Sequence, residues 1–463
     1  MHYPPGKAPL AILILAVISS ALLLLFPPAK KPENKLQVWT FAKAHYDAYS
    51  KAIPEFERTN PGTQVDVQYV HLRAVTTRMR SAFASDLPVP DLLETEISKA
   101  GSFFLGPVQD IGFVDLSEEL HKPQPDGPPW IDRIVRSRFA PYTSRRVIDG
   151  VEKDFIFGLP HDVHPVLLAY RRDIFEAHGV DAEKLTTWDA FLTEGRKIMK
   201  AMNGDGPKNH FLIELNDSSF EHFEVLLFQN GGGLFHADGT LRIDDEEAVQ
   251  TMLWFVPLVA GPDRVAYSLG WNFELMNRSQ ENKLLLSVLM PDWFSGYYQK
   301  YVPAASGKMA LMPLPAFKPG GRRTSTRGGT MLGFPKRAPH FKKAWELGLK
   351  LYFDTESRIE QFKEFNILPP TREAWRHPAL SEPSPYWSGQ PIGKLYAEQA
   401  DNTPPQYTSP YIILAKSKIG EALSDCVKYY NAKGATGFEQ YVRERLKRSG
   451  DEVRAMKTLN PYQ

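Results

Sequence analysis

The segment GLPHDVHP, which begins at Gly158, contains side chains that could do chemistry: His161, Asp162 and His164. Two histidines that share a metal are typically spaced i, i+4 on a helix or i, i+2 on a strand, so the i, i+3 spacing disfavours a metal site. Nucleophilic catalysis is also disfavoured, because no Gly-x-Ser-x-Gly elbow or reactive-cysteine context accompanies the segment. Two interpretations stay open: hydrogen-bonding groups for a polyhydroxylated ligand, or a structural pair.

The elements that must position such side chains follow an α/β pattern. The strand-like LQVWTF precedes HYDAYSKAIPEFERT, which has helical spacing, and TQVDVQYV alternates as a half-buried strand does. A helix over RAVTTRMRSAFASD and a strand in PDLLETE follow. This alternation predicts a largely parallel sheet, whose ligands lie beyond the carboxyl ends of the strands. The loops after Phe41 and Leu93 are therefore candidate sites.

Composition excludes several classes of partner. The 463 residues carry 55 basic and 54 acidic side chains, a formal charge of +1, so no positive excess indicates a nucleic-acid partner. Cys426 is the only cysteine, which excludes an internal disulfide and a cysteine-based metal site. We predict no cofactor, because the glycine triplet at 231–233 lacks the Gly-Lys-Ser/Thr of a phosphate loop.

The N-terminal segment predicts attachment to a membrane. Residues 8–26 carry no charge and have the length that a helix needs to cross a bilayer. The following FPPAKK is a poor cleavage sequence, so we expect residues 1–30 to be an uncleaved signal-anchor, with a cleaved signal as the alternative. Taken alone, the lysines would keep the body cytoplasmic, since one precedes the segment and three follow it: Lys7, Lys30, Lys31 and Lys35.

Four longer stretches carry a family resemblance. They are VWTFAKAHYDAYSKAIPEFERTNPGTQVDVQYV; GLPHDVHPVLLAYRRDIFEAHGV with TTWDAFLTEGRKI; ENKLLLSVLMPDWFSGYY with MALMPLPAFKPGG; and TRGGTMLGFPKRAPHFKKAWELGLKLYF followed by NILPPTREAW. In their order and spacing they resemble the extracellular solute-binding proteins of ABC sugar importers, of the maltose-binding-protein-like type. The chain departs from that family in lacking a lipid-attachment cysteine after the N-terminal segment.

The resemblance implies an α/β fold with two lobes, the periplasmic-binding-protein fold, in which hinge crossings join the lobes and a ligand cleft lies between them. Lobe one would comprise residues 36–152 plus 318–367, and lobe two residues 153–317 plus 368–463. It also implies export, so we expect the body at the periplasmic or extracellular face of the cytoplasmic membrane, despite the lysines. The implied partners are a sugar or oligosaccharide, ABC permease subunits and, through the N-terminal segment, the membrane.

The same resemblance implies a set of ligand-binding residues. If GLPHDVHP is a strand, alternation places Asp162 and His164 on one face, which the family turns toward the cleft, and His161 on the other. Asp292 and Trp293 fall where a tryptophan often stacks on a sugar ring, with a core position as the alternative. The remaining positions match polar, glycine or aromatic contacts of the family: Lys43, His45, Glu96, Lys99, Gly329, Thr330 and Tyr411.

We therefore expect a binding protein, not an enzyme, that captures a sugar between its lobes and delivers it to a membrane permease. One alternative is a membrane-anchored subunit that senses sugar and reports to a kinase. Another is a polysaccharide-processing enzyme that uses Glu96, Asp162 or Asp292, since glycoside hydrolysis needs two carboxyl groups at a set separation.

Overall fold

Two five-stranded sheets organise the residues that the computed structural model describes, 12–17, 35–85 and 87–458. The first sheet has the order β2-β1-β3-β12-β6. β1 pairs in parallel with β2 and β3, as the alternation of strands and helices predicts, whereas β12 is antiparallel to both of its neighbours. The strand bounds are β1 (Lys35–Thr40), β2 (Gln64–Tyr69), β3 (Leu92–Glu96), β6 (Leu159–Pro160) and β12 (Thr330–Gly333).

The second sheet has the order β11-β7-β10-β8-β9. Its bounds are β7 (Val166–Arg171), β8 (Ile213–Glu214), β9 (Ala266–Tyr267), β10 (Ser287–Pro291) and β11 (Met309–Pro313). Every residue of β7 is buried, because alternate side chains enter two different cores: Val166 and Leu168 one, Leu167 and Ala169 the other. A strand covered on both faces reads as a continuous apolar run, which explains PVLLAY in the sequence.

Helices cover both faces of each sheet. Around the first sheet they are α2 (Lys43–Thr59), α3 (Leu72–Phe83), α4 (Ile97–Ala100), α5 (Ser117–His121), α6 (Trp130–Arg133) and α13 (Phe341–Phe353). Around the second they are α7 (Arg172–Ala177), α8 (Trp188–Asn203), α9 (Phe220–Gln229), α10 (Glu246–Val259), α11 (Phe273–Glu281), α12 (Asp292–Tyr301), α15 (Ile392–Ala400), α16 (Ile412–Lys433) and α17 (Phe438–Thr458). The helix α14 (Thr355–Phe365) contacts α2 and α13 as well as α12.

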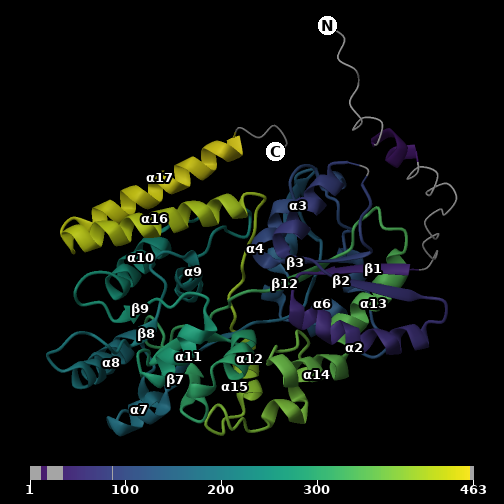
Figure 1. The fold of residues 1–463 in the computed structure, drawn as a ribbon. Helices are drawn as coiled ribbons and strands as arrows, with labels where there is room; N and C mark the ends of the chain where they lie inside the picture. Colours follow the sequence, from purple (N-terminus) through teal and green to yellow (C-terminus); the bar gives the residue numbers. More distant parts are fainter. Residues whose placement is uncertain (1–11, 18–34, 86, 459–463) are drawn as a thin grey trace.

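The two sheets define two lobes, with the first sheet on one side of the molecule and α8, α10, α16 and α17 on the other (Figure 1). The chain crosses between them at residues 161–165, between β6 and β7, and again between β11 and β12. This confirms the two-lobed α/β fold. The lobe bounds predicted from the sequence stay a prediction, and they assign β6 to lobe two although it pairs with β12 in the first sheet.

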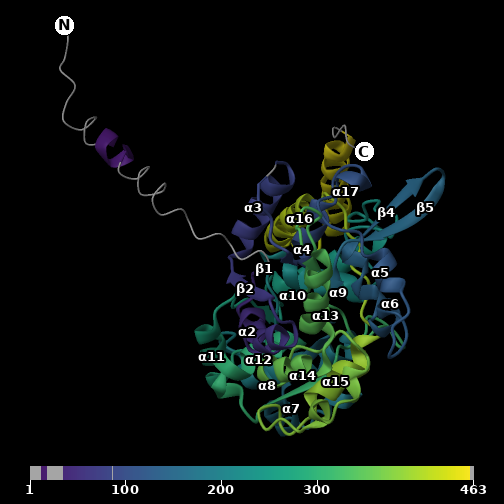
Figure 2. The same ribbon diagram turned by 90° about the vertical axis from the view of Figure 1, so that its right-hand side faces the viewer.

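A two-stranded hairpin, β4 (Thr143–Ile148) with β5 (Val151–Ile156), projects from the body of the molecule (Figure 2). Most of the predicted N-terminal anchor, residues 1–30, lies outside the described residues. Among the helices that are described, none combines the length and apolarity needed to cross a membrane.

Candidate ligand-binding site

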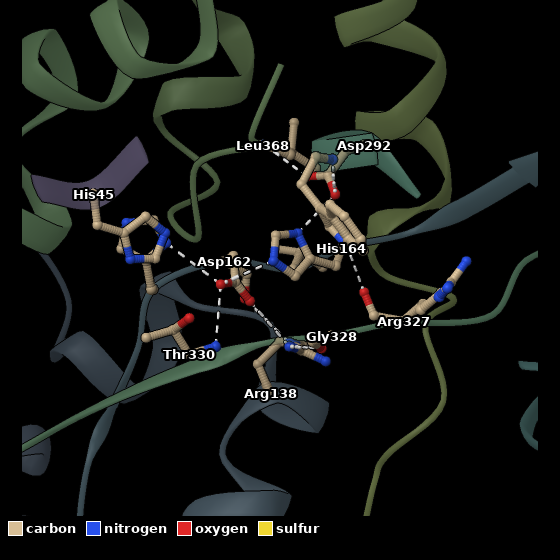
Figure 3. A network of polar contacts seen from close by, with 12 residues as sticks. His45, Arg138, Asp162, His164, Asp292, Arg327, Gly328, Thr330 and Leu368 are labelled. Atoms are coloured by element: carbon tan, nitrogen blue, oxygen red, sulfur yellow. Dashed lines mark hydrogen bonds and ion pairs between the residues drawn. The ribbon is translucent and has the colours of Figure 1, made fainter. Parts of the chain in front are cut away.

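The first crossing is not a strand between His161 and His164, contrary to the alternation expected from the sequence. His164 has a φ of 52°, in the left-handed region, and this turns its ring back toward Asp162. Its Nε2 lies 3.0 Å from Asp162 Oδ2 and its Nδ1 lies 2.7 Å from Asp292 Oδ1, so the imidazole bridges two carboxylates (Figure 3). All three residues are buried.

Each carboxylate of this bridge is held by further protein groups. The Arg138 guanidinium donates to Asp162 Oδ1 at 3.1 Å, and the Thr330 amide donates to Oδ2 at 3.2 Å (Figure 3). Asp292 accepts from the backbone amides of Trp293 and Leu368, both at 2.7 Å. The network therefore joins lobe one, the crossing and lobe two through buried hydrogen bonds.

In this network, each charged group favours the ionised form of its neighbours. Burial alone would lower the pKa of His164, but Asp162 and Asp292 outweigh it and raise this pKa to about 9. Burial would likewise raise the pKa of Asp162, yet His164, His161 and Arg138 hold it well below its usual value. An imidazolium between two carboxylates is the arrangement that results at neutral pH.

A second buried cluster surrounds Glu94 on β3. The His45 Nδ1 lies 3.0 Å from one carboxylate oxygen, and the hydroxyls of Tyr352, Tyr49 and Thr40 also donate to this carboxylate. Burial would raise the pKa of Glu94, but the nearby histidines and the Thr40 hydroxyl lower it to about 2, so it is ionised. His45 is thus part of the lobe-one core, with its ring stacked on His161 at 3.8 Å.

The cluster also offers three metal-ligating side chains, since ligand atoms of His45, Glu94 and His161 lie within 4.8 Å of one another. Two features oppose a cation here. The Glu94 oxygens are already engaged by the groups named above, and the Arg358 guanidinium lies 2.5 Å from His161 Nε2. Burial, with the nearby His45 and Arg358, lowers the pKa of His161 to about 3. The arrangement is that of a structural polar core.

Glu96, at the end of β3, faces the other lobe. Its carboxylate accepts from the Ser98 amide at 3.0 Å and caps α4. Burial raises its pKa, and Lys416 on α16 of lobe two opposes this rise. Lys416 in turn lies 2.8 Å from Glu224, so acidic and basic groups from both lobes meet at this point.

The remaining predicted residues are spread over the same region. Lys43 is exposed at the start of α2, where it pairs with Asp47, and Lys99 is half-buried on α4. Gly329 precedes β12, and its carbonyl accepts from the Ile97 amide at 2.9 Å. Tyr411, at the start of α16, borders a cavity of about 760 Å³ between the β4–β5 hairpin region and the 405–411 segment. The structure therefore brings together Asp162, His164, Asp292 and Thr330, with Gly329 beside them, but not Lys43, Lys99 or Tyr411.

Trp293 is half-buried at the start of α12, directly beside the bridge. Its indole Nε1 donates to the Arg327 carbonyl at 2.9 Å, and its ring lies 6.4 Å from that of His164. The Arg327 guanidinium lies 5.9 Å from the Trp293 ring, within cation–π range. Trp293 thus belongs partly to the core and partly to a surface that Arg327 shares.

A cavity of about 200 Å³ lies at the carboxyl end of β8, lined in part by Trp271, Phe294 and Arg327, which neighbour Trp293. It combines a carboxylate, a guanidinium, an imidazole and aromatic rings, which together suit a ligand with hydroxyl groups on an apolar ring. Its lining residues are Glu214, Asn216, Ser219, Glu221, His222, Gly270, Trp271, Met276, Phe294 and Arg327.

Glu214 is the buried acid of this cavity. Burial raises its pKa to about 7, with Arg327 opposing the rise. Arg327 is directed by Glu221, 2.5 Å from its Nη2, and by His222, 3.3 Å from its Nη1. The sequence analysis identified none of these four residues. One sequence feature indicates Glu214: it ends the short apolar run FLIE, and ligands lie at the carboxyl ends of strands.

Comparison with known families decides the class of protein. Residues 42–348 match the sequence model described as bacterial extracellular solute-binding protein, which is well over half of the chain. The chain belongs to this family. The solute-binding protein therefore acts outside the cytoplasmic membrane, as the resemblance implies.

Individual proteins agree with this assignment. An arabinooligosaccharide-binding protein of Bacillus subtilis (strain 168) is 26% identical over 368 residues, which covers 77% of this chain and 78% of that protein. Its namesake in Halalkalibacterium halodurans is 22% identical, covering 76% and 75%. A solved family 1 extracellular solute-binding protein superimposes with a TM-score of 0.70 at 20% identity, covering 90% of this chain and 99% of that one. These structural likenesses support the fold of the solute-binding protein.

Proposed function

We propose that this solute-binding protein captures a sugar or oligosaccharide between its lobes and delivers it to the permease of an ABC transporter. The observation that carries the proposal is the cavity at the carboxyl end of β8, where Glu214 and Arg327 lie beside the exposed ring of Trp271. A carboxylate accepts hydrogen bonds from sugar hydroxyls, and a guanidinium donates hydrogen bonds to them. An indole face covers the apolar side of a sugar ring.

The names of related proteins suggest which ligands to test first. Both curated relatives are named for arabinooligosaccharides. Structural neighbours were solved with β-1,6-galactobiose and with maltotriose, so the fold accepts short oligosaccharides of several kinds. Arabinooligosaccharides are therefore our first candidates for this chain.

The residues predicted from the sequence divide into two proposed roles. Glu96, Lys99, Lys43, Trp293 and Tyr411 are half-buried or exposed and are proposed to contact ligand or the opposite lobe when the lobes close. The buried members are proposed to fix the geometry of the crossing behind the cleft: His45, Asp162, His164, Asp292, Gly329 and Thr330.

Calorimetric titration of the purified protein with arabinooligosaccharides tests the proposal. We expect binding at one site, with no new product in the mixture by chromatography. Glu214→Gln at pH 8, where the wild-type carboxylate is ionised, should weaken binding about tenfold to a hundredfold, the loss of one charged hydrogen bond. Ligand at about 100 times its dissociation constant should stabilise the wild type by about 2.7 kcal/mol. Cleavage of the oligosaccharide, or equal affinity in the variant, would contradict the proposal.

We also propose that residues 1–30 hold the protein at the outer face of the membrane. The support is the uncharged run at 8–26 and the poor cleavage sequence that follows it. Intact-mass measurement of protein extracted from membranes should give the full chain. A mature N-terminus near Lys30 in a freely soluble fraction would make the segment a cleaved signal.

A further inference from the structure

A row of aromatic side chains leads away from the cavity beside Glu214. We define the aromatic row as Trp293, Trp271, Phe273, Tyr297 and Tyr301. Successive ring centroids lie 5.7 Å apart from Trp293 to Trp271, 5.5 Å from Trp271 to Phe273 and 5.1 Å from Phe273 to Tyr301. Three members are spaced i, i+4, i+8 on α12, so a single face of that helix carries them: Trp293, Tyr297 and Tyr301.

The row is unusually open to solvent for so many large rings. Trp271 is 58% exposed and Tyr301 is 43% exposed. Trp271 stacks on Phe294 at 5.3 Å and 26°, which supports the indole from one side. Contiguous exposed aromatic surface on a secreted protein typically marks a binding surface.

Lobe one also carries exposed or half-buried rings, on α2 and β2, and α2 and α12 both contact α14. Tyr69, at the end of β2, is 53% exposed and lies edge-on to Tyr46 of α2 at 6.5 Å. Burial raises the pKa of Tyr297, and the nearby Tyr301, with Tyr69 and Asp47 of lobe one, adds to the rise. Lysines lie over the outer rings, Lys43 at 5.3 Å from Tyr46 and Lys300 at 5.5 Å from Tyr301. Aromatic faces rimmed by polar donors suit a carbohydrate chain.

The size of the cavity gives an independent reason for an extended ligand. About 200 Å³ is below the range of roughly 300–1,000 Å³ typical of sites that enclose a whole small molecule. An oligosaccharide whose first unit occupies that cavity must place its other units outside it, and Trp271 belongs to both the cavity and the row.

From this geometry we infer that the aromatic row is an outer subsite, along which the later units of a linear oligosaccharide lie. The inference rests on the proposed function and adds to it a preference for length: affinity rises as the ligand reaches Tyr301. It names Trp271 and Tyr301 as residues that determine this preference.

Titration of the full-length protein with two length series, arabinooligosaccharides and maltooligosaccharides from one unit to six, tests the inference. The quantity compared is the ratio of affinities for the longest and shortest members that bind. Tyr301→Ala should lower this ratio about tenfold, the effect of one lost stacking contact. Trp271→Ala should lower the ratio too, and should weaken the shortest ligand as well, because its ring also borders the cavity.

Tyr441→Ala is the matched control, since it removes a ring from a surface stack with Tyr429 at 4.1 Å on the distant α16–α17 pair. It should leave the ratio unchanged, and all variants should melt near the wild-type temperature. A wild-type ratio near one, or an unchanged ratio in both cleft variants, overturns the outer subsite while sugar binding itself stands. Failure of every sugar in both series to bind the wild type overturns the proposed function, and the subsite with it.

Discussion

At the scale of single residues, the bridge through His164 shows how one backbone angle decides a role. A strand would have sent Asp162 and His164 outward together, but the positive φ of His164 folds its ring onto Asp162. The side chains predicted to meet a ligand contact one another, and Asp292 completes the set. A positive φ at a non-glycine residue carries little sequence signal, which is why the type and proximity of these residues were predictable and their contacts were not.

The bridge predicts a specific pH dependence of stability. Because the folded-state pKa of His164 is raised to about 9, its contribution is fully present below about pH 6.5 and is lost as pH rises through 9. The wild type should lose about 1–3 kcal/mol of unfolding free energy over this window through His164 alone. His164→Asn, which tolerates positive φ, should be less stable by about 3–5 kcal/mol at pH 6.5 and should lack this loss.

Urea unfolding at several pH values between 6 and 9.5 measures both proteins, and their difference removes the effect of groups that they share. If the two stability curves run parallel across the window, His164 is not the cation of the bridge.

At the scale of elements, the regular parts of the fold follow from the sequence and the irregular parts do not. The strands and helices from β1 to β3 form where hydrophobic periodicity indicates, and the Thr187 hydroxyl caps α8 by accepting from the Ala190 amide. By contrast, β8 is two residues long and gives almost no periodic signal, so the sequence pattern does not predict Glu214 as a site residue. Short strands are fixed by their neighbours in the sheet, which sequence patterns do not contain.

The turn into β12 provides a test at this scale. Gly329 has a φ of 147°, and a Cβ there would lie 2.4 Å from Arg138 Nη2 and 3.1 Å from Ile97 Cδ1. Since Arg138 is held by Asp162, the clash would disturb the network that joins the lobes. We expect Gly329→Ala to lower the unfolding free energy by about 2 kcal/mol more than Gly62→Ala.

Gly62 is the matched control, because its φ of 84° is also left-handed while no described atom lies within 4 Å of its added Cβ. Equal losses for the two variants in urea unfolding would mean that the surroundings of Gly329 relax freely.

At the scale of the whole molecule, two lobes joined by buried crossings imply hinge motion around a ligand. The resemblance of four sequence stretches was enough to predict this architecture. It was not enough to fix where each crossing lies, because β6 contributes two residues to the first sheet before the chain leaves it. The lobes are predictable from order and spacing, whereas the hinge depends on pairing between distant segments.

Closure can be followed with two fluorescent labels, since the native Cys426 is fully buried and burial raises its pKa to about 12. Labels at Ser81→Cys on α3 and Lys200→Cys on α8 report on opposite lobes, and both positions are exposed. Energy transfer should change when a binding oligosaccharide is added. A pair within lobe one, Thr59→Cys with Ser81→Cys, should not respond, and an unresponsive interlobe pair at saturating ligand would contradict closure.

The antiparallel pairing of Thr330 with Glu96 has a consequence for how the chain is made. The first sheet is complete only when β12 has joined it, a strand synthesised long after its neighbours β3 and β6, and the core of the second lobe is complete only with α16 and α17. The core of lobe one needs residues up to Phe353 and that of lobe two residues up to Val453, so contact order works against early folding. Slow folding suits a protein that acts outside the membrane, because it lengthens the time during which the chain is still unfolded and can be exported.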